Sequence, residues 1–410
     1  MTTGKIGVAL VGTGWMGGAL LRRLAARDDA TVCCIVETDP ERGRAAAAAA
    51  GRPDTPVLDH YADALARPDV QAVVLASPNA FHAPQALAAL AAGKHVFCEK
   101  PCATTYANHL ALVAADRRHP ELTTFTDYIL HFDPMETRLR EMVAGDAFGK
   151  IVQLQVNYRN PVNVAGDKAW KLQKSLMGDA FGMAIIHALS VIHGLMQAQG
   201  DAPVEIMATA MPAQRRPIEA EPIWNVLIRF ASGATGICLG NIDFGNGYDA
   251  YHNLSGTHGG FVFESLADRP QKVRYWSERD TCGQWLWPFD AARCAGQHLT
   301  GLAWPADLGT PDAADVFEQQ SGACVAHFLE CVRQGKKSPL GFAAAQGIAD
   351  LGWAAQVAAK LGRPVPLPLD ETLASVEFFC HGAWGRRDSA ERGSRKGADG
   401  ADGTLPALPP

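Results

Sequence analysis

Three glycines near the start of the chain have the spacing of a phosphate-binding turn. They lie in the stretch VGTGWMG, directly after the apolar run at 5–11. In that setting the first glycine allows a tight turn, the second lets the backbone approach a pyrophosphate, and the third lets helix and strand pack closely. The N-terminus of the following helix then faces the phosphates. The candidate cofactor-binding residues of this turn are Gly12, Gly14, Trp15, Met16 and Gly17.

An acidic residue follows at the distance expected for a ribose contact. Glu37 lies twenty positions after Gly17, at the end of the apolar run TVCCIVE. A carboxylate there accepts hydrogen bonds from the adenosine ribose and repels a 2′-phosphate, which favours NAD over NADP. Thr38, Arg42 and Arg44 stand close by and suit a 2′-phosphate, so NADP stays open as the alternative. A solvated strand end is the structural alternative for Glu37.

Two later segments carry further polar side chains, SPNAFH at 77–82 and GKHVFCEKP at 93–101. With the glycine turn before them, they resemble the N-terminal half of the Gfo/Idh/MocA oxidoreductase family. FTDYILHFDP at 125–134 resembles a variant of the family's next segment, with Asp127 at its glycine and His131 at its arginine. DAFGKIVQLQV and CVRQGKKSP also resemble family segments, so the resemblance covers about 5–370.

The resemblance implies a role for the lysine of the EKP signature. It places Lys100 beside the nicotinamide and the reacting hydroxyl, with a commonly cis peptide bond before Pro101. An ammonium there hydrogen-bonds the substrate oxygen, stabilises developing negative charge and passes a proton. Glu99 is then expected to position this lysine or the nicotinamide ribose. The remaining cofactor-binding residues implied by the resemblance are Ser77, Pro78, Asn79, His82, Glu99 and Lys100.

The second-domain helix departs from the family pattern. Most family dehydrogenases carry GGGxxxDxGxH, whereas 177–187 reads MGDAFGMAIIH. His187 falls on the family histidine, but Met183 occupies the aspartate position. Four residues make about one helical turn, so both still share a face, from which the acid is missing.

Three interpretations of this departure stay open. In the first, Lys100 and His187 suffice, and the near-neutral pKa typical of histidine suits a general base. In the second, Asp179 replaces the missing carboxylate, although N-capping is its structural alternative. In the third, the protein is a non-catalytic regulator that senses a dinucleotide or a sugar.

Further substrate contacts are expected from the segment 157–175, because the comparable region lines the pocket in relatives. Lys168 and Lys171 are candidates there beside an arginine and a tryptophan, and Asn241, Asp243 and Tyr248 stand in a later glycine-rich turn. No metal-ligand spacing occurs, and hydride transfer to nicotinamide needs none. The candidate substrate-binding residues are Lys100, Arg159, Trp170, Met183 and His187.

Apolar runs alternate with helical patterns through the first third of the chain, which predicts a doubly wound parallel sheet. We therefore expect an α/β Rossmann domain over 1–127. Period-two patterns after it predict an α+β domain over 128–385, with an open, mostly antiparallel sheet. A single long helix is expected at 179–198, and helices return at 313–334 and 342–361. The stretch 386–410 is expected to be a disordered tail.

Composition narrows the class of protein. The chain has 410 residues, 48% of them hydrophobic, and a formal net charge of −6, which argues against nucleic acid and fits a cytoplasmic globular protein without a membrane partner. Its ten cysteines are scattered and are expected to be reduced. An uncovered face of the second sheet would be closed by another copy, giving a homodimer or homotetramer. The expected reaction is NAD-linked oxidation of a secondary hydroxyl on a sugar, sugar derivative or cyclitol.

Overall fold

A computed structural model describes residues 4–245, 249–264, 273–288 and 313–372 of the chain. The predicted tail and Tyr248 lie outside these residues. The predicted boundary near residue 127 stays a prediction, because the described residues all belong to one compact unit.

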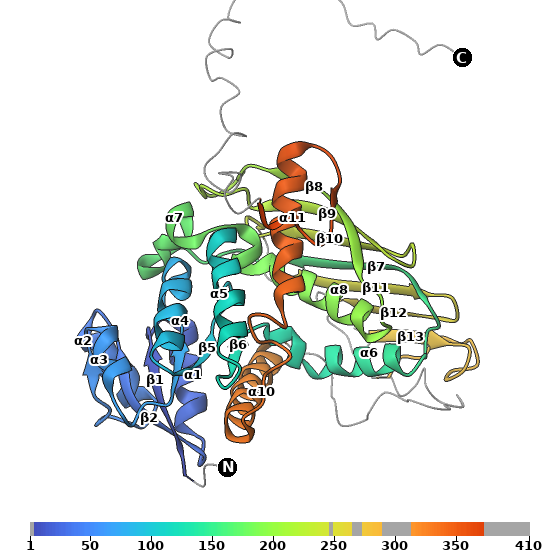
Figure 1. Ribbon diagram of the computed structural model, residues 1–410. Helices are drawn as coiled ribbons and strands as arrows, with labels where there is room; N and C mark the ends of the chain where they lie inside the picture. Colours follow the sequence, from blue (N-terminus) through green and yellow to red (C-terminus); the bar gives the residue numbers. More distant parts are fainter. Residues whose placement is uncertain (1–3, 246–248, 265–272, 289–312, 373–410) are drawn as a thin grey trace, which may run out of the picture. The chain divides into compact units, whose positions relative to one another are not determined.

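The first sheet has six parallel strands in the order β3-β2-β1-β4-β5-β6 (Figure 1). This order confirms the predicted Rossmann architecture, in which ligands bind beyond the carboxyl ends of the strands. The strands are β1 (Ile6–Val11), β2 (Ala30–Val36), β3 (Val57–Leu58), β4 (Ala72–Leu75), β5 (His95–Cys98) and β6 (Thr124–Thr126).

Alternate residues of these strands pack on opposite faces of the sheet, as the pleat requires. Leu10 joins a core that includes Leu20 of α1, whereas Val11 joins a second core that includes Ala86 of α4. Both faces are therefore covered, which explains why the strands are apolar runs. The helices of this part are α1 (Trp15–Ala25), α2 (Pro40–Ala49), α3 (Tyr61–Ala66), α4 (His82–Ala91) and α5 (Tyr106–Arg118), with a 3-10 turn η1 (Asn79–Phe81).

The second sheet has eight strands in the order β13-β12-β11-β7-β10-β9-β8-β14. Among the described strands only the β10 and β7 pair is parallel, so the sheet is mostly antiparallel, as predicted. Its strands are β7 (Ile151–Arg159), β8 (Pro203–Met211), β9 (Ile223–Phe230), β10 (Thr235–Asn241), β11 (Asp249–Gly256), β12 (Gly259–Glu264), β13 (Val273–Ser277) and β14 (Val365–Pro366).

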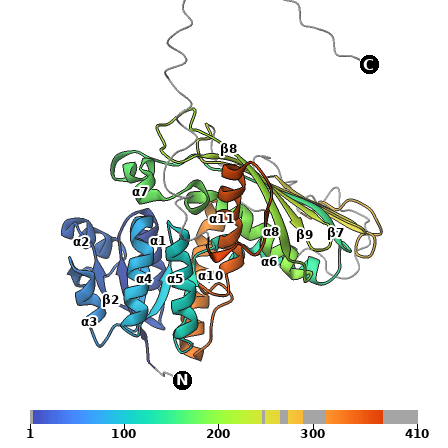
Figure 2. The same cartoon turned by 45° about the horizontal axis from the view of Figure 1, so that its top comes forward.

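Helices cover one face of this sheet. α8 packs on β7 and α11 packs on β8, on the same side of the strands (Figure 2). The other face carries exposed apolar side chains, including Val152 and Leu227. Closure of that face by another copy stays a prediction. The helical elements of this part are η2 (Ile129–Phe132), α6 (Pro134–Ala144), η3 (Gly166–Leu172), α7 (Lys174–Met177), η4 (Phe181–Ile185), α8 (Ile186–Ala198), α10 (Ala313–Gln334) and α11 (Gln346–Leu361).

The predicted helix at 179–198 is interrupted near its start. Residues Phe181–Ile185 form a π-helical turn, and the regular α-helix begins only at Ile186. The stretch Phe181–Ala198 is long and apolar enough to cross a membrane, with a mean hydropathy of 1.4, but 78% of it is buried inside the structure. Core helices of globular proteins have the same composition.

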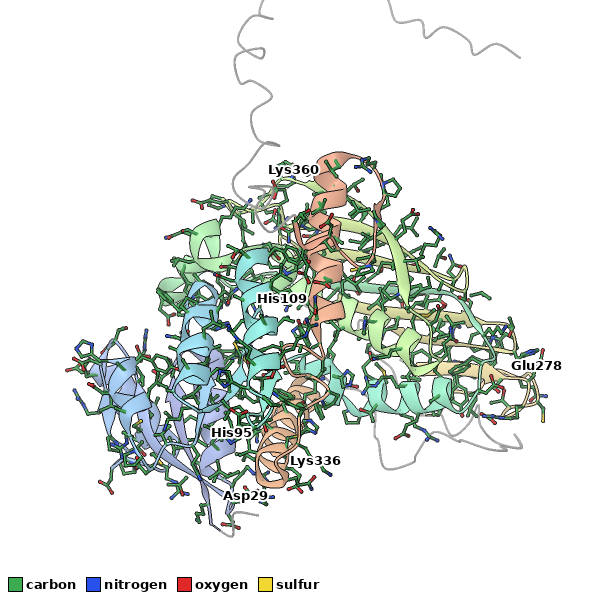
Figure 3. The ribbon with its side chains drawn as sticks, in the orientation of Figure 1. Asp29, His95, His109, Glu278, Lys336 and Lys360 are labelled. Atoms are coloured by element: carbon green, nitrogen blue, oxygen red, sulfur yellow. The ribbon has the colours of Figure 1, made fainter. Side chains whose placement is uncertain are left out.

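The last two described helices connect the two sheets. α10 packs against α1, and its Arg333 forms an ion pair with Asp29 at the start of β2. α11 lies beside α5, where Asp350 stands 3.5 Å from the ring of His109; both Asp29 and His109 are labelled in Figure 3. α11 also packs on α8 and β8, so it joins α5 to the second sheet.

Candidate active site

The glycine turn forms a close-packed cradle at the N-terminus of α1. Gly12 has a φ of +88°, and a Cβ added there would lie 2.7 Å from the carbonyl oxygen of Ala76. A Cβ at Gly17 would lie 2.1 Å from the Gly12 oxygen, whereas one at Gly14 would meet nothing within 4 Å. Glycine is thus required at two positions, and the space beside the third is open. This cradle fits a dinucleotide pyrophosphate.

Glu37 directly follows β2 and is a buried, fully engaged carboxylate. It accepts hydrogen bonds from the amide and hydroxyl of Thr13, at 2.9 and 2.6 Å, and pairs with Arg42 at 2.5 Å. Burial favours its protonated form, but the bonds from Arg42, Thr13 and the Asp39 amide outweigh burial and hold the pKa of Glu37 at about 2. Arg42 is therefore committed to Glu37, and Thr13 is a partner that the motif alone did not reveal.

The SPNAFH loop is tied to both neighbouring segments. Asn79 donates to the carbonyl of Met177 at 2.8 Å, and the ring nitrogens of His82 lie 2.7 Å from the carbonyl oxygens of Pro101 and Ser77. Burial lowers the pKa of His82. These side chains brace the loop that follows β4, with Pro78 leading into η1 and the Ser77 hydroxyl bonded to Gln85.

Lys100 lies two residues beyond the end of β5, and its side chain reaches η4. Its Nζ donates to the carbonyl oxygen of Met183 at 2.5 Å, and the peptide bond to Pro101 is cis, as the resemblance implies. A Cβ at Gly182 would lie 2.6 Å from Pro101 Cγ, so a glycine is needed for this approach. Burial lowers the pKa of Lys100, while the charges of Glu99 and Asp127 oppose that shift.

His187 lies about one helical turn after Met183, and its side chain is buried. Its ring packs 5.5 Å from that of Tyr158, and its Nδ1 has no hydrogen-bond partner among the residues that the structure describes. Burial, and then the charge of Lys100, lowers the pKa of His187 well below its usual range. The imidazole is therefore neutral, with one buried ring nitrogen that no described residue bonds.

Asp179 is used in capping the π-helical turn. One of its carboxylate oxygens accepts from the Gly182 amide at 2.7 Å, and the other accepts from Gln356 of α11 at 3.2 Å. Met183 is half-buried and packs against the core. The capping alternative therefore describes Asp179, and position 183 supplies only its backbone carbonyl to Lys100.

The remaining substrate candidates fall into two groups. Arg159 pairs with Asp249 at 2.8 Å at the end of β7, so its guanidinium is engaged within the sheet. Lys171 lies over the ring of Trp170, 5.7 Å from its centroid. Burial and then the charges of Lys100 and Lys168 lower the pKa of Lys171 to about 8. Lys171 and Lys100 are therefore close enough for their charges to interact.

The fold and the site together define an NAD-binding oxidoreductase. Residues 6–126 match the model of an oxidoreductase family with an NAD-binding Rossmann fold, and residues 137–262 match the GFO/IDH/MocA C-terminal domain. The chain belongs to the GFO/IDH/MocA family.

Relatives with known names are similar to different lengths of the chain. Inositol 2-dehydrogenase from Acidothermus cellulolyticus is 27% identical over 296 residues, which is 71% of this chain and 82% of that protein. Inositol 2-dehydrogenase from Leifsonia xyli is 37% identical over 165 residues, but only 47% of its length is matched.

Among solved structures, levoglucosan dehydrogenase in complex with NADH matches with a TM-score of 0.75 and 22% identity, covering 89% of this chain and 100% of that chain. GenD2 from gentamicin A biosynthesis in complex with NAD matches with a TM-score of 0.72 and 23% identity, covering 90% and 97%. At these identities the likeness shows the fold.

Proposed function

We propose that the protein is a cytoplasmic NAD-dependent dehydrogenase that interconverts a secondary hydroxyl and a ketone on a sugar, sugar derivative or cyclitol. The observation that carries this proposal is the hydrogen bond from Lys100 to the Met183 carbonyl of η4, next to His187 and its unpaired Nδ1. The names of the inositol and levoglucosan dehydrogenases support the substrate class.

The chain's own residues have distinct tasks in this mechanism. The glycine cradle and Glu37 would hold the dinucleotide, and bound NAD supplies the hydride acceptor. Lys100 hydrogen-bonds the substrate oxygen and takes its proton in the amine form that burial favours. The neutral His187 accepts a second substrate hydroxyl or relays the proton.

A substrate panel tests this function directly. Purified protein is incubated with sugars and inositols in the presence of NAD or NADP, and the near-ultraviolet absorbance of reduced nicotinamide is followed. We expect turnover with NAD and a loss of about 10²- to 10⁴-fold in Lys100→Ala, the range of general acid–base contributions. The exposed Lys150 gives a matched control, because Lys150→Ala removes a cation away from the site. Undiminished turnover in Lys100→Ala would refute the mechanism.

Met183 favours one alternative from another class, a regulator that binds a dinucleotide or sugar without turnover. No carboxylate stands at position 183, and Lys100 is bonded to the backbone there. Tight NAD binding with no reduction across the panel, unchanged in Met183→Asp, would favour this alternative.

We also propose that the exposed face of the second sheet is an interface between copies. The apolar side chains on it, Val152 and Leu227 among them, support a homodimer or homotetramer. Light scattering of the wild type and of Leu227→Lys measures this, and a monomeric wild type would contradict it.

A further inference from the structure

Two buried acids stand side by side at the carboxyl edge of the first sheet. Cys98 of β5 pairs with Thr126 of β6, so the next residues, Glu99 and Asp127, leave adjacent strands together. The Asp127 amide donates to the carbonyl of Cys98 at 2.9 Å, which holds the two chains in register beyond the strand ends. Glu99 is 5% exposed and Asp127 is 0% exposed.

Few donors among the described residues reach these acids: the Cys324 thiol interacts with Asp127 and the Lys100 amide with Glu99. Both oxygens of Asp127 and one oxygen of Glu99 are buried, and no described residue makes a hydrogen bond of ordinary geometry to them. The two carboxyl groups instead interact with each other. Two ionised carboxylates only accept hydrogen bonds, so facing carboxyls require a proton between them. Burial, together with Asp127, raises the pKa of Glu99 well above its usual range, and burial raises the pKa of Asp127.

One cation balances the charge that remains. Lys100 follows Glu99 directly and responds to the charges of both acids, more strongly to Glu99 than to Asp127. A pair holding one proton carries one negative charge, which neutralises an ammonium at Lys100. The other titratable groups around the pair and around Lys100 are Cys98, Cys102, Cys324, His82, His187 and Lys171.

We propose that Asp127 is a positioning residue for the reaction, which shares one proton with Glu99 so that the pair's single negative charge controls the protonation of Lys100. This inference rests on the proposed dehydrogenase function. When the substrate hydroxyl reaches Lys100, its O–H bond breaks and an N–H bond forms on the amine. The charge of the pair then stabilises the new ammonium, for which position 183 offers no carboxylate.

Infrared spectroscopy without substrate tests the shared proton. At neutral pH the wild type should show the carbonyl stretch of a protonated carboxylic acid that Asp127→Asn removes, because the asparagine amide donates to Glu99 and leaves it ionised. Asp116→Asn is the matched control, since Asp116 is buried but already accepts from Lys337 at 2.7 Å and the Ala343 amide at 2.9 Å. The wild-type minus control spectrum should lack this band.

Substitutions of the two acids should move the ionisation of Lys100 in opposite directions. Asp127→Asn concentrates the charge on Glu99, the more strongly coupled acid, and should move the ionisation of Lys100 to higher pH by about one unit. Glu99→Gln leaves the charge on Asp127 and should move the ionisation to lower pH. NMR of isotope-labelled lysine, assigned with Lys100→Ala, follows this ionisation without turnover, so the result is independent of whether the protein is a dehydrogenase.

Kinetics complete the test where turnover is found. At neutral pH, kcat should fall by up to tenfold in Asp127→Asn, since a rise of one unit in the pKa of Lys100 lowers its amine fraction by at most that factor, while KM stays near that of the wild type. If Asp127→Asn does not fold, Glu99→Gln still provides both measurements: the loss of the infrared band and the move of the Lys100 ionisation to lower pH. A band that persists in either variant, or an unmoved Lys100 ionisation with only a lower Tm, would overturn the proposal.

Discussion

The two sides of the proposed site differ in how far their polar atoms are satisfied. On the cofactor side, Glu37 is buried but accepts bonds from Thr13, Arg42 and the Asp39 amide. On the catalytic side, buried atoms of Glu99, Asp127 and His187 have no hydrogen-bond partner in the described part of the chain. Both regions lie at the carboxyl edge of the same sheet or directly against it.

This difference separates a binding surface from a reacting one. Buried polar groups in folded proteins are nearly always paired, so unpaired ones point to a ligand or a shared proton. The cofactor side is built in advance around an ionised acid, whose pKa is lowered. The catalytic side keeps its groups near neutrality, with the pKa values of His187 and Lys100 lowered and that of Glu99 raised. Such perturbed groups are typical of sites where protons move.

Removing the unpaired imidazole should give the largest effect within this comparison. His187→Ala should lower kcat by about 10²- to 10³-fold, within the range of general acid–base contributions, and leave NAD affinity near that of the wild type. His193→Ala is the control, because His193 lies on the same helix and packs near Gly347. Steady-state kinetics and NAD titration measure both, and equal losses in the two variants would mean a packing role only.

The same variant has a pH signature. Burial and the charge of Lys100 lower the pKa of His187, so the ring is not protonated at neutral pH. The wild-type activity should therefore show no acid limb in the usual range of histidine; such a limb, absent in His187→Ala, would contradict the neutral imidazole.

Most of the architecture was predictable because its signals are local. Apolar runs separated by helical patterns predicted the first sheet, and the expected helices at 313–334 and 342–361 correspond to α10 and α11. The last strand of the first sheet is only Thr124–Thr126, because Asp127 leaves the sheet and the chain bends into η2.

The pairing of site residues was less predictable because it depends on strand order. Glu99 and Asp127 are far apart in sequence and meet only because β5 and β6 are neighbours. Likewise, no pattern in the sequence predicts the π-helical turn at 181–185. There Gly182 clears Pro101, and the Met183 carbonyl meets Lys100. Resemblance supplied Lys100 and His187 as candidates but not the groups that control their charge.

The contact between Pro101 and the π-helical turn η4 can be loosened at Gly182. Gly182→Ala would place a Cβ 2.6 Å from Pro101 Cγ, so the turn carrying Met183 must shift. Overpacking of this kind costs about 1–3 kcal/mol, and we expect a lower Tm with kcat reduced about tenfold. Gly194→Ala on α8 is the control, since its Cβ would be 3.3 Å from the flexible Arg140 side chain. Unchanged kcat with a lower Tm would separate packing from catalysis.

The satisfied side can be tested through cofactor choice. Glu37→Gln removes the charge that is expected to repel a 2′-phosphate and frees Arg42 to attract one. We expect NAD affinity to fall about tenfold, the usual worth of a charged hydrogen bond, and the preference over NADP to narrow. Titration with both dinucleotides measures this. Tighter NADP than NAD binding in the wild type would overturn the role given to Glu37.

The smallest effect should be an acid-dependent loss of stability on the satisfied side. The pKa of Glu37 is lowered to about 2, below the ordinary value of about 4.3 expected in the unfolded chain. Its contribution is therefore present above that ordinary value and is lost as the pH falls toward 2.

Thermal melting across this range should thus show a gap in Tm between wild type and Glu37→Gln that is full at neutral pH and closes on acidification. Glu278→Gln is the control, because Glu278 pairs with His258 at 2.9 Å on the surface, where ion pairs contribute little. A gap that stayed constant down to low pH would mean that Glu37 acts through packing. The contrast between an ionised cofactor side and a near-neutral catalytic side would then lose its electrostatic basis.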